Sequence, residues 1–310
     1  MKVLVVGGGY LGLKIADYLN RHSIEILLIT SKVHEIPNEL NSIKIYQHCW
    51  ESKLINKSLF NNIDVVVYAA GMNADDCERD PYEAIRVNGL HPESFLRLAC
   101  ESKVGRFIYL STAHVYANPL VGEFDEDSPL LNFHPYATSH HIAEMSIIRE
   151  SQKKTIEGVI LRLANVFGLP LGDPRSSSTL FVNDICKQAV INRKIEIKSS
   201  RNQRRNFISI DTFCECIHHF VKIASGSLAH NIFNVGSNWT PSLEEVANLV
   251  QSNCKVLFGY TPKLIFHDNN SIEHPPLHYV LDRLVESGFV PNNKENFEIS
   301  KTLKVLFSYE

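Results

Sequence analysis

The segment from Gly7 to Gly12 constrains the fold of this chain more than any other part of the sequence. It reads Gly-Gly-Gly-Tyr-Leu-Gly and directly follows the apolar run Val3–Val6. It also opens a helical pattern in which Leu11, Ile15 and Leu19 fall on one face. A G-x-G-x-x-G pattern between a strand and a helix is typical of a dinucleotide-binding turn. We therefore expect the chain to begin with a strand, a glycine turn and a helix that together bind a dinucleotide.

Each glycine of this pattern has a separate task. Gly7 permits the tight turn, Gly9 lets a diphosphate approach the backbone, and Gly12 lets the helix and the strand pack closely. The helix that begins here presents backbone N–H groups and the positive end of its dipole to the phosphates. The residues predicted to bind the cofactor at this turn are Gly7, Gly9, Tyr10, Leu11 and Gly12.

Short apolar runs recur through the first half of the chain, separated by segments with helical spacing. This alternation is typical of βαβ units, and all-apolar strands are typical of a parallel sheet that is covered by helices on both faces. The predicted fold class is therefore α/β, a Rossmann-type doubly wound parallel sheet. The predicted strands are Val3–Val6, Ile26–Ile29, Ile43–Tyr46, Val65–Tyr68, Phe107–Leu110 and Val159–Leu163.

After Gly168 the alternation becomes less regular. The predicted elements here are loops at 169–174 and 176–178, a helix at 180–192, and strands at 194–197, 207–210 and 232–235, the last two each followed by a helix. We predict a nucleotide-binding domain over residues 1–165, to which segments near 207–240 return. Residues 166–310 are predicted to form a smaller, partly interleaved substrate domain.

Charge and hydropathy argue against several classes of protein. A net charge of −3 gives no basis for binding nucleic acid or a membrane surface. No apolar run reaches the length of a membrane span, and Met1-Lys2 leads directly into a strand instead of a signal peptide. The seven scattered cysteines are typical of free thiols in a reducing compartment. We expect a cytoplasmic protein.

Cys214, Cys216, His218 and His219 superficially resemble a metal-binding cluster. On a helix, however, Cys214 and His218 share one face, while Cys216 and His219 turn away from it. Buried free cysteine usually behaves as a small hydrophobic residue. We therefore predict no metal site.

The end of the second predicted strand bears on the choice of cofactor. NAD-binding sites usually place Asp or Glu there to bind the ribose 2′-hydroxyl. This chain has Thr30, Ser31 and Lys32 instead, two hydroxyls and a cation. These residues would tolerate a 2′-phosphate and could bind it, so we predict NADP, with NAD as the alternative. A solvated loop lysine is the simpler interpretation of Lys32.

Several further motifs occur in an order that is known from one enzyme family. Ala69-Ala70-Gly71 follows the fourth predicted strand, and Val87-Asn88-Gly89 lies in a helix. Ser111-Thr112-Ala113 follows the fifth strand, and Tyr136 and His140 lie four residues apart on one helical face. With these motifs the chain resembles the NAD-dependent epimerase/dehydratase family, the extended short-chain dehydrogenases, over nearly its whole length.

The resemblance implies a role for each motif. Thr112 would donate a hydrogen bond to a substrate oxygen, and Tyr136 would transfer the proton. Asn88 would support a water network in the active site, and His140 would stand at the place of the family's lysine. The small residues Ala69, Ala70 and Gly71 would lie along the cofactor.

Two later motifs extend the resemblance to the substrate. Asn165 lies in a segment that resembles the strand and loop entering the sugar-nucleotide site, and Arg205 lies in one whose arginine grips the substrate diphosphate. A planar guanidinium suits bidentate phosphate binding, although a surface basic patch is the simpler interpretation. The resemblance implies a nucleotide-sugar substrate and a homodimer, which is common in the family.

The chain also departs from the family pattern. The glycine turn is one residue shorter than the usual G-x-x-G-x-x-G of extended members. Thr112 is followed by Ala113 and His114, where the resembling 4,6-dehydratases have an Asp-Glu pair for water elimination, so dehydration is disfavoured. We interpret His114 and His141 as satisfied surface or helix histidines.

The third departure is His140. In the family, lysine at this place binds the nicotinamide ribose and lowers the pKa of the tyrosine. A unit charge at about 4 Å in an effective dielectric of about 20 stabilises a tyrosinate by roughly 4 kcal/mol, about three pKa units. Histidine can do this only while protonated, and its ordinary pKa is about 6.5. If protonated His140 acted in this way, an oxidative rate would fall as pH rises through its pKa. Neutral His140 could still donate one hydrogen bond to a ribose hydroxyl.

The direction of the reaction follows from this substitution. Reduction of a ketone needs protonated Tyr136, whereas oxidation of an alcohol needs the tyrosinate that His140 supports badly. The sequence therefore favours an NADP-dependent reductase of a keto-sugar nucleotide, or an epimerase. The rival hypothesis is a cofactor-binding sensor or partner subunit with weak or no turnover.

Overall fold

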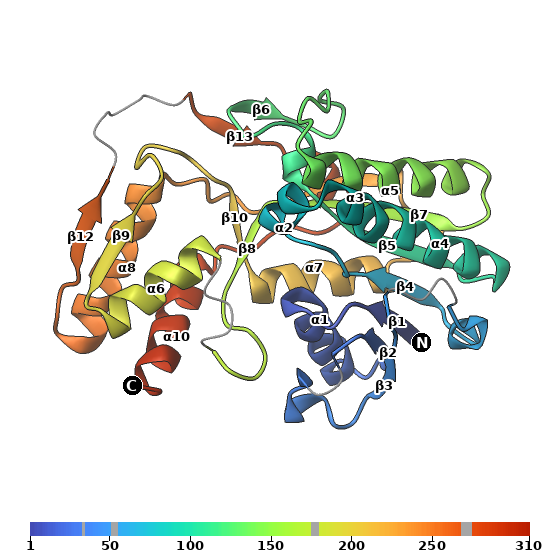
Figure 1. Cartoon of the computed structure of the whole chain (residues 1–310), viewed down its shortest axis with the longest axis horizontal. Helices are drawn as coiled ribbons and strands as arrows, with labels where there is room; N and C mark the ends of the chain where they lie inside the picture. The colour runs from blue at the N-terminus through green and yellow to red at the C-terminus, as the bar shows by residue number, and fades with distance from the viewer. Residues whose placement is uncertain (33–34, 51–54, 175–179, 268–274) are drawn as a thin grey trace.

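The structure, a computed structural model, describes residues 1–32, 35–50, 55–174, 180–267 and 275–310. Its centre is a seven-stranded parallel sheet with the strand order β11-β7-β5-β4-β1-β2-β3 (Figure 1). The strands are β1 (Lys2–Val6), β2 (Glu25–Thr30), β3 (Lys44–Gln47), β4 (Val65–Tyr68), β5 (Arg106–Thr112), β7 (Glu157–Leu163) and β11 (Ile232–Val235). The predicted α/β class with a Rossmann-type sheet is confirmed.

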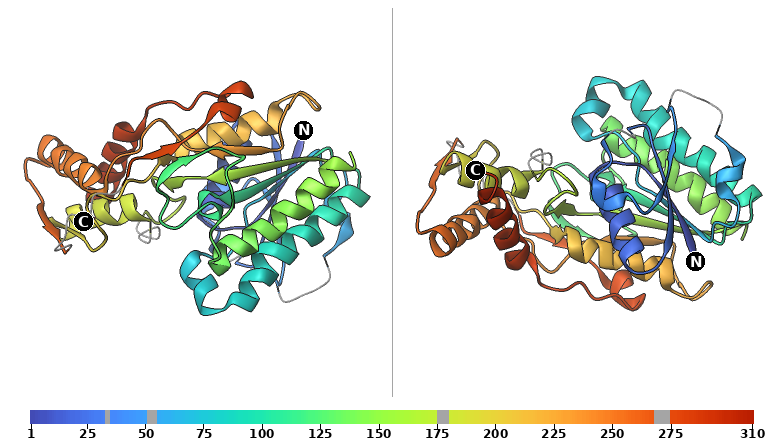
Figure 2. Two further views of the ribbon diagram at one scale, coloured as in Figure 1. Left: turned by 90° about the horizontal axis from the view of Figure 1, so that it is seen from above. Right: turned by 90° about the horizontal axis from the view of Figure 1, so that it is seen from below.

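Long helices cover both faces of the sheet. They are α1 (Tyr10–Arg21), α4 (His91–Glu101), α5 (Pro135–Gln152) and α7 (Ile210–Lys222). In Figure 2, α7 lies on one side of the strands and α4 and α5 lie on the other. Val3 and Val5 of β1 belong to the core that contains α1 and α7, while Leu4 and Val6 belong to the core beneath α4 and α5. The apolar runs predicted from the sequence thus fill both faces, because successive side chains of a strand point to opposite sides.

A third core lies in the C-terminal part, which extends away from the sheet in Figure 1. It is formed mainly by the helices α6 (Phe181–Ile191), α8 (Leu243–Phe258) and α10 (Glu295–Phe307). The smaller strands pair two by two: β6 (Gly122–Phe124) with β13 (Leu277–Tyr279), β8 (Asn165–Phe167) with β10 (Phe207–Ser209), and β9 (Lys194–Ile197) with β12 (Lys263–Phe266). The remaining helices are α2 (Ala74–Arg79), α3 (Pro81–Ala84), α9 (Asp282–Glu286), the π-helix η4 (Ile85–Leu90), and the 3-10 helices η2 (Asn38–Leu40), η3 (Lys57–Phe60) and η5 (Ala113–Val115).

The chain returns to the large sheet after its excursion into the C-terminal part. Helix α7 packs beside α1, and Ile232 of β11 pairs with Ile160 of β7. Strand β10 differs from this pattern, because it pairs with β8 and not with the large sheet. Its Phe207 is buried in the third core together with Phe167, which explains why this strand stays with the C-terminal part. The loop predicted at 176–178 lies outside the described residues.

The topology places the site. Strand order reverses between β1 and β4, and in sheets of this kind ligands bind in the crevice beyond the carboxyl ends of the strands at such a reversal. Among the residues that the structure describes, no helix has both the length and the apolar character needed to cross a bilayer.

Candidate active site

The glycine turn links β1 to α1. Gly7 has a φ of +115° and its N–H donates to the Ile29 carbonyl at 2.8 Å. A Cβ at Gly7 would lie 2.6 Å from the Ala70 nitrogen, and one at Gly12 would lie 1.9 Å from the Gly7 oxygen, so both places require glycine. At Gly9 a Cβ would meet nothing within 4 Å, and the first turn of α1 has no acidic side chain. The turn therefore leaves open space beside the first N–H groups of α1, which have no partner within the helix and could bind a diphosphate.

The residues at the end of β2 are only partly available to a ligand. Thr30 is buried, and its Oγ1 accepts the N–H of Lys32 at 3.1 Å. Ser31 is exposed. The Lys32 ammonium donates to Glu35 at 3.1 Å, in an ion pair whose two side chains are each about two-thirds exposed. The carboxylate of Glu35 therefore lies beside Lys32, although the predicted cofactor motif of Thr30, Ser31 and Lys32 contained no carboxylate.

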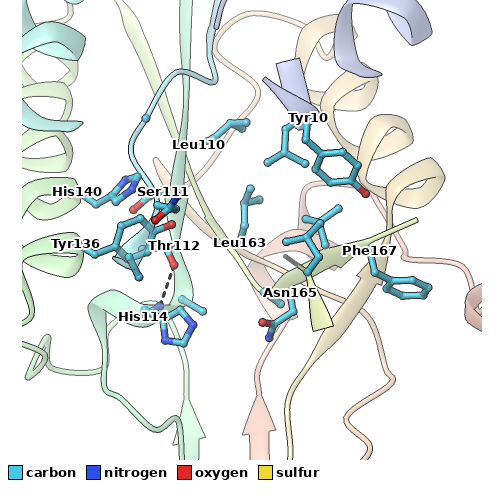
Figure 3. A pocket seen from close by; sticks show the side chains of 18 of the residues that line it. Tyr10, Leu110, Ser111, Thr112, His114, Tyr136, His140, Leu163, Asn165 and Phe167 are labelled. Atoms are coloured by element: carbon cyan, nitrogen blue, oxygen red, sulfur yellow. Dashed lines mark hydrogen bonds between the residues drawn. The ribbon is translucent and has the colours of Figure 1, made fainter. Parts of the chain in front are cut away.

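A cavity of about 440 Å³ opens beyond the carboxyl ends of β1, β4, β5 and β7 (Figure 3). The predicted site residues that line it are Tyr10, Leu11, Ala69, Ala70, Gly71, Thr112, Tyr136, His140, Asn165 and Arg205. Those that do not are Gly7, Gly9, Gly12, Thr30, Ser31, Lys32 and Asn88. Segments that are far apart in the sequence thus meet at one crevice, with Tyr136 and Thr112 on one wall and Tyr10 on the other.

Tyr136 and Thr112 converge on the cavity. Pro135 begins α5, and His134 caps it by accepting the Tyr136 N–H through Nδ1 at 3.1 Å. Burial raises the pKa of Tyr136, and a hydrogen bond with the Thr112 hydroxyl offsets part of the rise. Neither lysine nor arginine within the described residues lowers the pKa of Tyr136. The phenol is therefore protonated at neutral pH.

His140 lies one helical turn further along α5 and is buried. Its ring packs edge-on against Tyr136, with 4.7 Å between the ring centroids. Burial lowers the pKa of His140 to about 4, although Glu144 acts in the opposite direction. The imidazole is therefore neutral at ordinary pH, and a protonated His140 cannot replace the lysine charge there.

Asn88 is completely buried in the π-helix η4 and has contacts other than the predicted water network. Its Oδ1 accepts the N–H of Met72 at 2.7 Å, and its Nδ2 donates to Ser139 Oγ at 3.3 Å and to the Cys77 sulfur at 3.4 Å. Asn88 therefore ties the loop after β4 to helix α5, instead of facing the cavity.

A buried ion pair beneath the cavity was missed by the sequence analysis. Glu144 accepts from Arg162 at 3.1 and 2.8 Å and from the Ser111 hydroxyl at 2.5 Å. Burial alone would raise the pKa of Glu144, but its bonds with His141, Arg162 and Ser111 outweigh burial and lower the pKa to about 2. This network connects α5 to β5 and β7 and so fixes the position of Tyr136 on α5 relative to Thr112 on β5. The available signal was Arg162, the one charge in the otherwise apolar predicted strand Val159–Leu163, since a buried charge must be paired.

His114 lies in the short helix η5 and hydrogen-bonds with the backbone of Ala117, which agrees with the interpretation of a satisfied helix histidine, but it also lines the cavity below Thr112. The His114 backbone N–H donates to Thr112 Oγ1 at 3.2 Å. Burial and the nearby charge of Arg205 lower the pKa of the His114 imidazole. The short 3-10 helix η5 turns this side chain inward, which the spacing of the sequence did not indicate. His141 is partly exposed and lies 3.7 Å from Glu144.

Arg205 and Asn165 lie on the same cavity. The Arg205 guanidinium donates to Gln203 at 3.1 Å and lies 5.7 Å from the centroid of the Phe181 ring. Burial lowers its pKa, and the described part of the chain offers it no carboxylate partner. Asn165 uses its Nδ2 to donate to the Asn206 carbonyl at 2.9 Å. Among the described residues, no carboxylate neutralises the arginine charge in this cavity, which suits an anionic ligand.

The cysteine and histidine residues of α7 do not form a cluster of metal ligands. Cys214 and Cys216 are both buried in the apolar core, and His219 hydrogen-bonds to Ser287 at 3.1 Å. No group of three or more potential metal ligands occurs in the described parts of the chain.

Comparison with known proteins defines the class to which this fold and site belong. The family model for the NAD dependent epimerase/dehydratase family matches residues 3–236. A dTDP-D-glucose 4,6-dehydratase of Homo sapiens is 29% identical over 260 residues, 79% of this chain and 72% of that protein. Among solved structures, the UDP-N-acetylglucosamine 4-epimerase of Methanobrevibacter ruminantium in complex with UDP-N-acetylmuramic acid has a TM-score of 0.83 at 19% identity and covers all of both chains. The UDP-glucose 4-epimerase of Thermus thermophilus in complex with NAD has a TM-score of 0.80 at 20% identity, with 99% of each chain covered.

The chain belongs to the NAD dependent epimerase/dehydratase family. The predicted family is therefore confirmed, as is the prediction that the protein is an enzyme. The homodimer, the cytoplasmic location and the domain boundary at residue 165 stay predictions.

Proposed function

We propose that this enzyme binds NADP, or NAD, along the glycine turn and a nucleotide-sugar in the cavity, and that it reduces a keto-sugar with Tyr136 as the proton donor. The observation that carries this proposal is the state of Tyr136 and His140. Tyr136 is a phenol with a raised pKa, and the side chain beside it, His140, is a neutral imidazole. Such a pair begins a reduction in the correct protonation state, whereas an oxidation must first create a tyrosinate.

The residues of the cavity divide the work. When bound, the reduced nicotinamide supplies the hydride. The His114 backbone N–H occupies a lone pair of Thr112 Oγ1, and the Thr112 hydroxyl, which hydrogen-bonds with Tyr136 in the free protein, would donate instead to a carbonyl oxygen of the bound substrate. The Tyr136 hydroxyl gives its proton to the same oxygen. Arg205 would neutralise the substrate diphosphate, which fits its lack of a carboxylate partner in the described chain. The relatives support the substrate class, since they include a dTDP-glucose dehydratase and UDP-sugar epimerases.

A direct test incubates the purified enzyme with NADPH or NADH and keto-sugar nucleotides carrying dTDP or UDP. Loss of nicotinamide absorbance together with a product two hydrogens heavier by mass spectrometry is the expected result. The second candidate function, a cofactor-binding protein with weak turnover, is favoured by the replacement of the lysine by His140. It predicts that the cofactor binds and stays unconsumed. Interconversion of sugar epimers without net consumption of cofactor would contradict the reductase and indicate an epimerase.

We expect the variants Gly9→Ala and Gly12→Ala to separate cofactor binding from folding. A methyl group at Gly9 meets nothing in the free protein, so Gly9→Ala should keep the melting temperature and weaken cofactor binding by obstructing the diphosphate. A methyl group at Gly12 would lie 1.9 Å from the Gly7 oxygen, so Gly12→Ala should lower the melting temperature. Thermal unfolding and nicotinamide fluorescence titration measure the two effects. Unchanged cofactor affinity in Gly9→Ala would remove this turn from the binding site.

We also expect the enzyme to bind NADPH more tightly than NADH, with Lys32 and Glu35 acting in opposite directions. Glu35→Gln removes a negative charge beside the expected 2′-phosphate and releases Lys32, so it should increase the preference for NADPH, whereas Lys32→Gln should reduce it. Exposed charges contribute roughly 0.2–1 kcal/mol, so we expect changes of about one- to fivefold in the dissociation constant. Lys44→Gln, an exposed lysine on β3, is the matched control. A clear NADH preference of the unaltered enzyme would refute the NADP assignment.

A further inference from the structure

The buried hydroxyl of Tyr109 on β5 connects the backbone of η4 with the ring of His140. It lies 3.0 Å from the Asn88 carbonyl oxygen and 2.7 Å from His140 Nδ1. All three residues are buried, Asn88 and Tyr109 almost completely and His140 at 6% exposure. Because these atoms are buried away from water, the hydrogen bonds at both contacts must be made with the hydrogens of Tyr109 and His140.

Asn88 lies in the π-helix η4, and Pro92, four positions further on, has no N–H to donate to the Asn88 carbonyl. A carbonyl oxygen can only accept, so the contact at 3.0 Å is a hydrogen bond only if Tyr109 donates its proton to it. Without that proton, the Tyr109 oxygen and the Asn88 carbonyl oxygen would face each other 3.0 Å apart with no hydrogen between them.

The direction of the second bond follows from the first. A phenol has a single proton, and with that proton on the Asn88 carbonyl the Tyr109 oxygen can only accept from His140. His140 Nδ1 must then carry a hydrogen. Since a neutral imidazole has one N–H, Nε2 of the same ring is left with a lone pair.

We propose that Tyr109 is a positioning residue that fixes His140 in the Nδ1–H tautomer and makes Nε2 a hydrogen-bond acceptor on the cavity wall. The ligand group that such an atom recognises is a hydroxyl that donates to it, such as a ribose hydroxyl of the bound dinucleotide. As an acceptor, His140 Nε2 has the opposite role to a lysine ammonium, which only donates hydrogen bonds. This role is also opposite to the donor role that the sequence suggested for neutral His140. A hydroxyl that donates to His140 cannot donate the same proton to the oxygen of Tyr136, so Tyr136 is left with less support for its ionised form.

The assignment of a ribose hydroxyl rests on the proposed function, whereas the tautomer does not. The test therefore reads the ring directly, by ¹⁵N NMR of the full-length protein labelled at histidine. The His140 signals are identified by their absence from the spectrum of His140→Gln. In the free protein we expect a protonated Nδ1 and an unprotonated Nε2. A protonated Nε2 with a bare Nδ1 would overturn the proposal without any variant of Tyr109.

Two variants of buried tyrosines then test the cause. Tyr109→Phe removes the hydroxyl that holds Nδ1–H, and we expect the ring to shift toward the Nε2–H tautomer. Tyr68→Phe is the matched control, because Tyr68 is buried beside Tyr109 and its hydroxyl has no hydrogen-bond partner in the part of the chain that the structure describes. This control should leave the His140 signals in place. An unchanged tautomer in folded Tyr109→Phe would show that Tyr109 is not the cause.

Addition of the cofactor separates the two parts of the proposal. If NADPH or NADH binds, as measured by its fluorescence, we expect the Nε2 signal to move in the direction of hydrogen-bond acceptance while Nδ1 stays protonated. Binding with an unmoved Nε2 signal would overturn the role toward a ligand hydroxyl. Failure of both dinucleotides to bind would refute the proposed function. It would not affect the tautomer assignment, which is tested by the spectrum of the free protein.

Discussion

Replacement of Tyr136 by phenylalanine is expected to lower the rate of keto-sugar reduction by about 10²–10⁴-fold, the usual contribution of one general acid. Tyr136 is the phenol that lies against Thr112 on the cavity wall, and burial keeps its proton in place at neutral pH. Phenylalanine keeps the ring and its edge-on packing against His140, so the affinity for the cofactor should not change. Stopped-flow reduction and fluorescence titration of the same samples measure the two quantities.

Two controls make this result specific. Tyr68→Phe removes a buried phenol hydroxyl that has no hydrogen-bond partner among the described residues, and it should keep both activity and cofactor affinity. Thr112→Val removes the other hydroxyl that faces the substrate oxygen, and it should reduce the rate less than Tyr136→Phe, because it removes a hydrogen bond and not the proton itself. Full turnover in Tyr136→Phe would mean that another group donates the proton, and His114 would be the first candidate on the same cavity.

The sequence predicted those features that depend on local pattern. The turn between the first strand and helix requires a positive φ at Gly7 and close backbone contacts at Gly7 and Gly12. Only glycine meets these requirements, so the glycine pattern was enough to predict the turn. Tyr136 and His140 were placed on one face because helical spacing is fixed. The all-apolar strands predicted a sheet covered on both sides, and both sides of the sheet are covered.

Features that depend on contacts between distant segments were not predicted. Glu144 and Arg162 are 18 residues apart and pair only because α5 packs across β5 and β7. The contacts of Asn88 with Met72 and Ser139 arise where the π-helix η4 lies between a loop and α5. The depressed pKa of His140 likewise results from burial, which the order of residues alone does not give. Tertiary environment, more than residue type, decided the chemistry at each of these positions.

The replacement of His140 by lysine is expected to raise the rate of alcohol oxidation. Oxidation requires the Tyr136 tyrosinate, and a cation at about 4 Å in an effective dielectric of about 20 favours it by roughly 4 kcal/mol. That value corresponds to about a thousandfold increase in the ionised fraction at neutral pH, and partial loss of the lysine charge through burial would reduce it to about a hundredfold. Initial rates of oxidation of a sugar-nucleotide alcohol, with NADP or NAD as acceptor, measure the effect.

The pH profile identifies the cause. His140 has a pKa of about 4, so it carries no charge to lose between pH 6 and 9. The oxidative rate of the unaltered enzyme should therefore climb about tenfold per pH unit through pH 8, as the Tyr136 phenol ionises, and not fall as it would if protonated His140 gave the support. In His140→Lys the climb should end up to about three pH units earlier, because the cation lowers the pKa of Tyr136. His141→Lys adds the same charge at the next, partly exposed residue of α5, which does not line the cavity, and should keep the profile of the unaltered enzyme. If His140→Lys and His141→Lys gave the same profile, the charge at position 140 would not act on Tyr136, and the preference for reduction would need another cause.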